Sequence, residues 1–160
     1  MYVEYIKGIT ERYQRLGYPA YQWYRAETPP PWAPIEKPLA ETRLAVLSTA
    51  GTYVAGQVAY YYKDDTSIRR IAKDTAIEDL RFSHITEHYL GDARADPDCV
   101  FPLTALRRLE AEGAIGALSD ELVSCMGGIY SQRRVGAELI PAVEAAFVEQ
   151  KAEAALLIPL

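Results

Sequence analysis

Short apolar runs that alternate with segments of helical periodicity restrict the fold of this chain more than any other feature. We interpret four runs as buried strands: residues 43–51, 79–85, 121–126 and 154–158. Residues 102–113 and 139–150 carry apolar side chains three and four positions apart, which predicts helices between the later strands. This order predicts an α/β fold with three layers, in which helices flank a mostly parallel sheet.

The first 42 residues have a different character. Apolar residues at helical spacing predict an amphipathic helix over residues 2–16, which Gly17 ends. Five of the eleven residues 28–38 are proline, which favours an extended strap lying over a surface. Aromatic residues surround it: Tyr18, Tyr21, Trp23, Tyr24 and Trp32. We expect the strap to cover the core of its own domain, and docking on a partner protein is the alternative.

Composition limits the size and setting of the protein. With 160 residues, 49% of them hydrophobic, we expect a single domain over residues 1–160, with its core in 43–160. The net charge of -5 and the scattered basic residues argue against a nucleic-acid partner. No apolar run approaches the roughly 20 residues that cross a bilayer, and the N-terminus does not have the pattern of a signal peptide. We therefore expect a cytoplasmic protein without a membrane partner.

Loops at the carboxyl ends of parallel strands meet at one edge of a sheet, where ligands commonly bind. Glycine-containing loops follow two of the predicted strands, and they offer five candidate substrate-binding residues: Ser48, Thr49, Gly51, Ser124 and Gly127. Their hydroxyls and backbone N–H groups suit a carboxylate or a small anion. Taken alone, glycine after a strand is more often ordinary turn chemistry. Neither loop has the spacing of a dinucleotide fingerprint or a phosphate loop.

Both histidines of the chain, His84 and His88, lie in "SHITEH" after the second predicted strand. On a helix this spacing would place both imidazoles on one face, as a metal ion requires, whereas in an extended segment they would diverge. We favour His84 as a catalytic residue that binds substrate or donates a proton, and we expect no resident metal. A metal-dependent hydrolase or lyase using His84, His88 and an aspartate is an alternative, and ordinary loop histidines are the simplest interpretation.

The two cysteines form no C-x-x-C pair, and we treat both as thiols. Cys125 follows a predicted strand and precedes two glycines, a position in which loop N–H dipoles can lower a thiol pKa. We therefore name Cys125 as a second candidate catalytic residue. Cys99 is equally well explained as a small buried hydrophobe, and the sequence does not show whether the two thiols meet.

Four segments in this order resemble the selenoprotein B family of glycine, sarcosine and betaine reductases and D-proline reductase: "RLAVLSTAGTYVAGQVAYYYKDDTSIRRIAKDT", "DLRFSHI", "DPDCVFPLTALRRLEAEGAIGAL" and "SCMGGIY". The resemblance covers roughly residues 43–160. It implies an oxidoreductase component in which a selenol or thiol attacks an activated amino-acid derivative. It also implies a thioredoxin-like or dithiol electron donor and a partner subunit that supplies a pyruvoyl group.

In that family a redox motif, a selenocysteine or cysteine followed by a further cysteine, is expected directly after a strand resembling "AALLIPL", whereas here nothing follows Leu160. We expect this cofactor-like motif in a lost segment beyond Leu160; a short relative without the nucleophile is the other option. The expected function is a thiol- or selenol-dependent oxidoreductase component acting on a small amino-acid-like substrate. The alternative is a non-catalytic ligand-binding or scaffold subunit docking on a partner enzyme, and a homo-oligomer is a further expectation.

Overall fold

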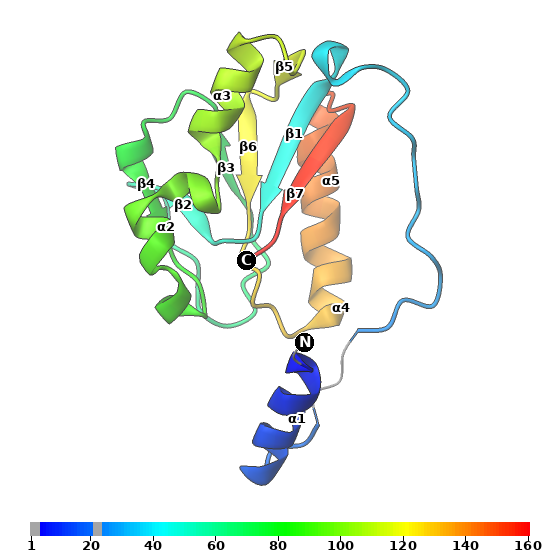
Figure 1. The fold of residues 1–160 in the computed structure, drawn as a ribbon, viewed down its shortest axis with the longest axis vertical. Helices are drawn as coiled ribbons and strands as arrows, with labels where there is room; N and C mark the ends of the chain where they lie inside the picture. Colours follow the sequence, from blue (N-terminus) through cyan, green and yellow to red (C-terminus); the bar gives the residue numbers. More distant parts are fainter. Residues whose placement is uncertain (1–3, 21–23) are drawn as a thin grey trace. The chain divides into compact units, whose positions relative to one another are not determined.

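The computed structural model of the chain describes residues 4–20 and 24–160. It divides into two compact units, residues 1–33 and residues 34–160, which we describe one at a time. Figure 1 shows the elements of each unit. Tyr21 and Trp23, which the sequence places beside the proline-rich strap, lie outside the described residues.

The N-terminal unit contains one helix, α1 (Tyr5–Arg15), in its described part. It confirms the predicted helix over the residues that the structure describes, and Gly17 follows it with a φ of 84°, a left-handed conformation that glycine adopts without strain. No residue of α1 is buried within the structure. The residues from 24 to 33 form neither helix nor strand, and Trp32 is 87% exposed.

The larger unit is built on a mostly parallel sheet around β1 (Arg43–Ser48). Parallel to β1 run β5 (Ala117–Leu118) and β6 (Glu121–Ser124) on one side and β7 (Ala154–Ile158) on the other. Beyond β6, the short strand β3 (Arg69–Ala72) pairs antiparallel. The predicted strands at 43–51, 121–126 and 154–158 therefore all lie in this sheet, which confirms the α/β class.

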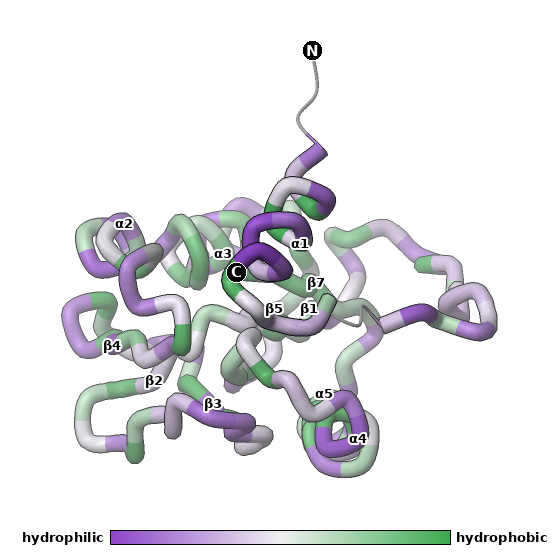
Figure 2. The backbone as a smooth tube through the Cα atoms, turned by 90° about the horizontal axis from the view of Figure 1, so that it is seen from below, coloured by the Kyte–Doolittle hydropathy of each residue, from purple (hydrophilic) through white to green (hydrophobic). Residues whose placement is uncertain are grey.

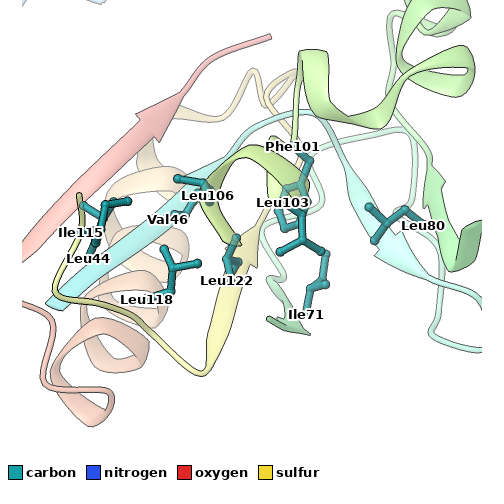
Figure 3. Close-up of a cluster of buried hydrophobic side chains, with 10 residues drawn as sticks. All are labelled: Leu44, Val46, Ile71, Leu80, Phe101, Leu103, Leu106, Ile115, Leu118 and Leu122. Carbon is teal, nitrogen blue, oxygen red and sulfur yellow. The ribbon is translucent and has the colours of Figure 1, made fainter. Parts of the chain in front are cut away.

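Helices cover both faces of the sheet. Figure 2 shows α3 (Leu103–Ala111) and α5 (Ile140–Glu149) on opposite sides of the strands. Under α3 lies the larger cluster of buried side chains, drawn in Figure 3: Leu44, Val46, Ile71, Leu80, Phe101, Leu103, Leu106, Ile115, Leu118 and Leu122. A second cluster lies under α5: Val123, Cys125, Leu139, Val143 and Ala146. The predicted three layers are thus present in residues 34–160.

A parallel arrangement of all four runs would place the second predicted strand in this sheet. The structure places it outside the sheet. β4 (Leu80–Phe82) instead pairs antiparallel with β2 (Thr52–Val54) in a separate two-stranded sheet. The reason lies in its burial pattern, because Leu80 and Phe82 are buried while Arg81 between them is exposed. Such alternation is typical of an antiparallel strand with one solvated face, whereas a central parallel strand is buried on both faces.

Further short elements occupy segments that the sequence left without regular structure. They are η1 (Leu39–Glu41), η2 (Ile77–Asp79), η3 (Glu87–Tyr89), α2 (Gly91–Ala95), η4 (Pro97–Cys99), α4 (Gln132–Arg134) and the π-helical turn η5 (Val135–Leu139). The π-helical turn ends two residues before Pro141, which has no backbone N–H and interrupts the regular ladder of the helix. Among the described residues, no helix is long and apolar enough to cross a membrane.

Candidate functional site

The loops after β1, β6 and β7 meet at the carboxyl edge of the sheet, near the C-terminal residue in Figure 1. The Gly51 N–H donates to the carbonyl oxygen of Cys125 at 3.0 Å, and the Cys125 N–H donates to that of Ser48 at 2.9 Å. The loop after β4 joins them although β4 lies outside the sheet, since the Ser83 N–H donates to the Gly51 carbonyl at 3.0 Å. The structure therefore brings four loops together at one edge.

Thr49 links three of these loops. Its N–H donates to the carbonyl oxygen of Ile158 at 3.0 Å, and its hydroxyl Oγ1 accepts from the N–H of Leu160 at 2.9 Å. A Cβ atom placed on Gly127 would lie only 2.9 Å from Thr49 Oγ1, so the loop after β6 packs directly against this side chain. Of the predicted substrate-binding residues, half-buried Thr49 and exposed Gly127 are the pair that reach the surface of the edge.

Ser48 and Ser124 lie side by side in β1 and β6, and both are fully buried at 0% exposure. Ser48 Oγ donates to the carbonyl oxygen of Val100 at 2.8 Å, while Ser124 Oγ accepts from the N–H of Thr52 at 2.9 Å. These bonds satisfy the hydroxyls inside the protein and hold the loops to the sheet. Their direct contact with a substrate stays a prediction.

The position of Gly51 depends on the absence of a side chain. Its φ is 65°, in the left-handed region, and an added Cβ would lie 2.1 Å from the carbonyl oxygen of Ser83. Only glycine permits both the turn and the close approach of the loop after β4. Gly51 thus fixes the shape of the edge, and it is buried.

His84 joins the loop after β4 to the loop after β6. Its side chain is 7% exposed, and Nε2 accepts from the Gly127 N–H at 3.2 Å. Nδ1 lies 2.6 Å from Thr86 Oγ1 and 3.1 Å from the Thr86 backbone nitrogen. The Thr86 N–H donates to Nδ1 and the Gly127 N–H donates to Nε2, so a backbone donor points at each ring nitrogen. Such donors favour the uncharged imidazole over the imidazolium, in which both nitrogens carry protons.

Burial lowers the pKa of His84 below its usual value, which keeps the imidazole neutral. In the neutral form Nε2 already accepts a hydrogen bond, so it has no proton for a substrate. The sequence predicted a substrate-binding or proton-donating residue, whereas the observed contacts describe a clamp between two loops. A catalytic role for His84 stays a prediction.

The two histidines do not share a site in this structure. His88 is exposed in the short turn η3, while His84 is buried against Gly127. Within residues 4–20 and 24–160, no group of three or more His, Cys, Asp or Glu side chains is placed to hold a metal ion. The metal-dependent alternative therefore has no ligand set in the described part of the chain.

Cys125 lies in the buried cluster under α5 and is 1% exposed. Burial raises the pKa of this thiol to about 11, which is opposite to the lowering that its position after a strand suggests. A protonated, buried thiol is a poor nucleophile, so the catalytic role named for Cys125 stays a prediction without geometric support. Cys99 is exposed rather than buried, and both cysteines are free thiols.

Tyr60 supports the same edge, although no sequence pattern pointed to it. Its ring is 4% exposed, its hydroxyl donates to the Ser124 carbonyl oxygen at 2.7 Å, and the Arg69 guanidinium lies 4.3 Å from the ring centre. Burial raises the pKa of the Tyr60 phenol. Three consecutive tyrosines in an irregular segment do not reveal which one turns inward.

A hollow of about 680 Å³ lies elsewhere, between β4 and α2. Its walls include Tyr53, Arg81 and Arg94, and Arg94 is already paired with Glu87. None of the site residues named from the sequence lines it. The hollow is therefore separate from the carboxyl edge.

Comparison with known proteins places the chain beside an amino-acid reductase subunit. Over 131 residues, 81% of this chain, it is 32% identical to D-proline reductase subunit gamma of Acetoanaerobium sticklandii. The chain spans about half, 54%, of the length of that protein. No protein-family profile and no solved structure matches the chain. The chain is therefore related to a subunit of D-proline reductase.

Proposed function

We propose that this chain is part of a reductase component that acts on a small amino-acid-like substrate through a thiol or selenol. The sequence relationship to a D-proline reductase subunit supports the class of reaction, and the resemblance to the selenoprotein B family supports the finer assignment. In this proposal a partner subunit activates the substrate. The thiolate or selenolate attacks the α-carbon of the activated derivative, and the Cα–N bond breaks with its electron pair leaving on nitrogen. A second thiolate of the redox motif then attacks the sulfur or selenium, so that the carbon leaves and takes up a proton. This step forms a disulfide or selenenyl sulfide, which a dithiol donor reduces with two electrons.

The observation that carries the proposal is the contact of Thr49 with the end of β7 and with Leu160. The Thr49 N–H binds the Ile158 carbonyl at 3.0 Å, and Thr49 Oγ1 binds the Leu160 N–H at 2.9 Å. Residues that follow Leu160 in a longer polypeptide would start beside Thr49 and Gly127. We propose that the nucleophile is a cysteine or selenocysteine in such residues.

The loops then have distinct roles in this proposal. Thr49 and Gly127 border the place where substrate meets nucleophile, and Gly51 sets the path of the neighbouring backbone. His84 acts as a positioning residue, because its Nε2 holds the Gly127 N–H at 3.2 Å. The buried Ser48 and Ser124 fix the strands from which these loops start.

The test begins with the full gene product isolated from its natural host. We expect an intact mass above the 17.9 kDa of this chain and a selenium- or thiol-specific label in the additional residues. With its partner subunits and a dithiol, the protein should reduce D-proline. A mass of 17.9 kDa together with no dithiol-dependent turnover would contradict the proposal.

Thr49→Val tests the role of the edge in that assay. Loss of one hydrogen bond at the site should lower kcat/KM by roughly three- to tenfold. Thr75→Val is the matched control, because Thr75 follows β3 at the opposite end of the strands, where Ala72 pairs with Glu121. Equal kcat/KM values for the two variants would mean that Thr49 is not part of the site.

A non-catalytic docking subunit is the second candidate, and the N-terminal unit favours it. Large apolar and aromatic side chains are exposed there: Tyr5, Ile6, Tyr13, Leu16, Tyr18, Tyr24 and Trp32. Aromatic residues of this kind often carry the binding energy of protein interfaces. Capture of a reductase subunit by the full chain, weakened by Tyr13→Ser and Trp32→Ser without loss of turnover in the reconstituted enzyme, would favour docking over catalysis.

A further inference from the structure

The loop after β6 is held by side chains from two different segments of the larger unit. On one side, His84 Nε2 accepts from the Gly127 N–H at 3.2 Å. On the other side, the carboxylate oxygen Oδ1 of Asp64 accepts from the N–H of Tyr130 at 2.7 Å and from that of Ser131 at 3.0 Å. Asp64 lies between β2 and β3, far upstream in the chain. Its contact therefore fixes the loop against a segment distant in the sequence.

The backbone conformation of Asp64 suits this contact. Its φ of 49° lies in the left-handed region, which aspartate adopts more readily than most residues. The carboxylate lies at the amino end of the helical run 132–149, where a negative charge is favourable. Because the acceptor is charged, it binds the two N–H groups more strongly than a neutral oxygen would.

The segment that carries Asp64 is itself fixed to the start of this helical run. Arg134 Nη1 donates to the Asp64 carbonyl oxygen at 2.6 Å, and Arg134 Nη2 donates to Thr66 Oγ1 at 3.0 Å. Thr66 is buried, and its hydroxyl donates to Glu138 Oε2 at 2.6 Å. Glu138 also forms an ion pair with Arg134 at 2.7 Å. Asp64 therefore holds the loop from a supported position.

A tight turn connects the two ends at which the loop is held. The Ile129 N–H donates to the Gly127 carbonyl oxygen at 3.0 Å, which leaves only Gly128 between them. Gly127 and Gly128 lack the side chains that restrict backbone rotation in other residues, so the conformation of this turn depends on contacts from outside. Release of the loop at the Asp64 end should therefore also loosen Gly127.

We infer that Asp64 is a positioning residue of the carboxyl edge, which keeps the loop after β6 in the conformation that places Gly127 against Thr49. This role rests on the function proposed above, in which Thr49 and Gly127 border the place where substrate meets nucleophile. Asp64 acts on Gly127 indirectly, through the N–H groups of residues 130 and 131 and the tight turn before them.

Three substitutions separate this role from other effects. Asp64→Gly removes the carboxylate but still allows the left-handed φ. Asp64→Asn keeps an oxygen acceptor and also tolerates that φ, so it should retain most of the hold on the loop. Asp65→Gly is the matched control, because Asp65 accepts from the N–H groups of Tyr61 and Ser67 within its own segment. It removes the same charge and adds the same backbone freedom without touching the loop after β6.

Hydrogen exchange measured by NMR on the purified full chain tests the hold without an assay of turnover. In Asp64→Gly, the amides of Tyr130 and Ser131 should exchange roughly tenfold faster, since each loses its acceptor. The Gly127 amide is decisive, because its own acceptor is unchanged, and it should exchange at least about threefold faster. Asp64→Asn and Asp65→Gly should keep the Gly127 rate within about twofold of the parent protein. Faster exchange at Tyr130 and Ser131 with an unchanged rate at Gly127 would overturn the inference.

Steady-state kinetics of the enzyme reconstituted with its partner subunits gives the second measurement. A displaced loop misaligns substrate and nucleophile, so kcat of Asp64→Gly should fall roughly tenfold while KM changes by less than about threefold. Asp64→Asn should recover most of this loss, and Asp65→Gly should retain the parent kcat. Equal kcat values for Asp64→Gly and Asp65→Gly count against the role of Asp64. A parent enzyme without turnover would instead contradict the proposed function, and the exchange rate of Gly127 would still decide on Asp64.

Discussion

Single residues at the carboxyl edge work mainly by linking loops. His84 shows this most clearly, because both ring nitrogens contact the protein and the imidazole is kept neutral by burial. Protonation would turn Nε2 into a donor facing the Gly127 N–H. The neutral form is therefore the one that holds the loop after β6 in place.

The stability of the fold should depend on pH through His84. Its folded pKa is below the ordinary 6.5, so the unfolded chain binds the proton first. The contribution is therefore present above pH 6.5 and is lost as the pH falls through that value toward the folded pKa. We expect the melting temperature to drop between pH 7.5 and pH 5.5, and this drop to be smaller in His84→Gln. An unchanged slope in His84→Gln would contradict the clamp.

At the level of elements, strand β7 was predictable to the residue, whereas β4 was placed in the wrong sheet. Five apolar residues in a row specify a strand in a parallel sheet, and 154–158 are the residues found. The run at 79–85 contains an exposed Arg81 between buried neighbours, a pattern that fits a two-stranded antiparallel sheet as well. Sequence periodicity predicts whether a segment is a helix or a strand more securely than it predicts which strands pair with each other. The reason is that strand pairing depends on contacts between residues far apart in the sequence.

The same limit applies to the candidate site. The rule that loops meet at the carboxyl edge of a sheet was enough to predict that Thr49, Gly127 and His84 lie close together. It could not show that the Ser124 hydroxyl turns inward to Thr52, or that burial raises the pKa of Cys125 to about 11. Those outcomes depend on which face of a strand the surrounding helices cover.

Substitution of Gly51 tests how closely the loop after β1 and the loop after β4 must approach each other. Gly51→Ala should lower the free energy of unfolding by about 3 kcal/mol, because it adds a steric clash with Ser83 to the left-handed strain. Gly56→Ala is the control, since Gly56 has a φ of 95° but no atom within 4 Å of an added Cβ. It should cost about 1 to 2 kcal/mol. Urea unfolding of both variants measures the difference, and equal losses would mean that the loop after β4 moves away at little cost.

At the scale of the whole molecule, the chain consists of a small N-terminal unit and a larger sheet-based unit. Residues 34–42 belong to the second, where Thr42 Oγ1 donates to the Pro38 carbonyl at 2.9 Å and the Gly116 N–H donates to that of Leu39 at 2.8 Å. The exposed residues from 24 to 33 precede this anchored segment.

Limited proteolysis should therefore cut first near Arg25 and leave a resistant product containing residues 34–160. Arg25 is exposed in a segment without helix or strand, which is the preferred kind of cleavage site. Mass spectrometry identifies the product. First cuts at the equally exposed Lys63 or Arg133, ahead of Arg25, would contradict this division of the chain.

The central position of β1 has a consequence for synthesis on the ribosome. Its parallel partners β5, β6 and β7 begin at Ala117, Glu121 and Ala154, all far downstream. At roughly 5–20 residues per second, the emerging polypeptide carries β1 without any of its ladder partners for several seconds. The middle of the sheet is made early and completed late, so the apolar residues of β1 lack some of their ladder partners until β7 leaves the exit tunnel.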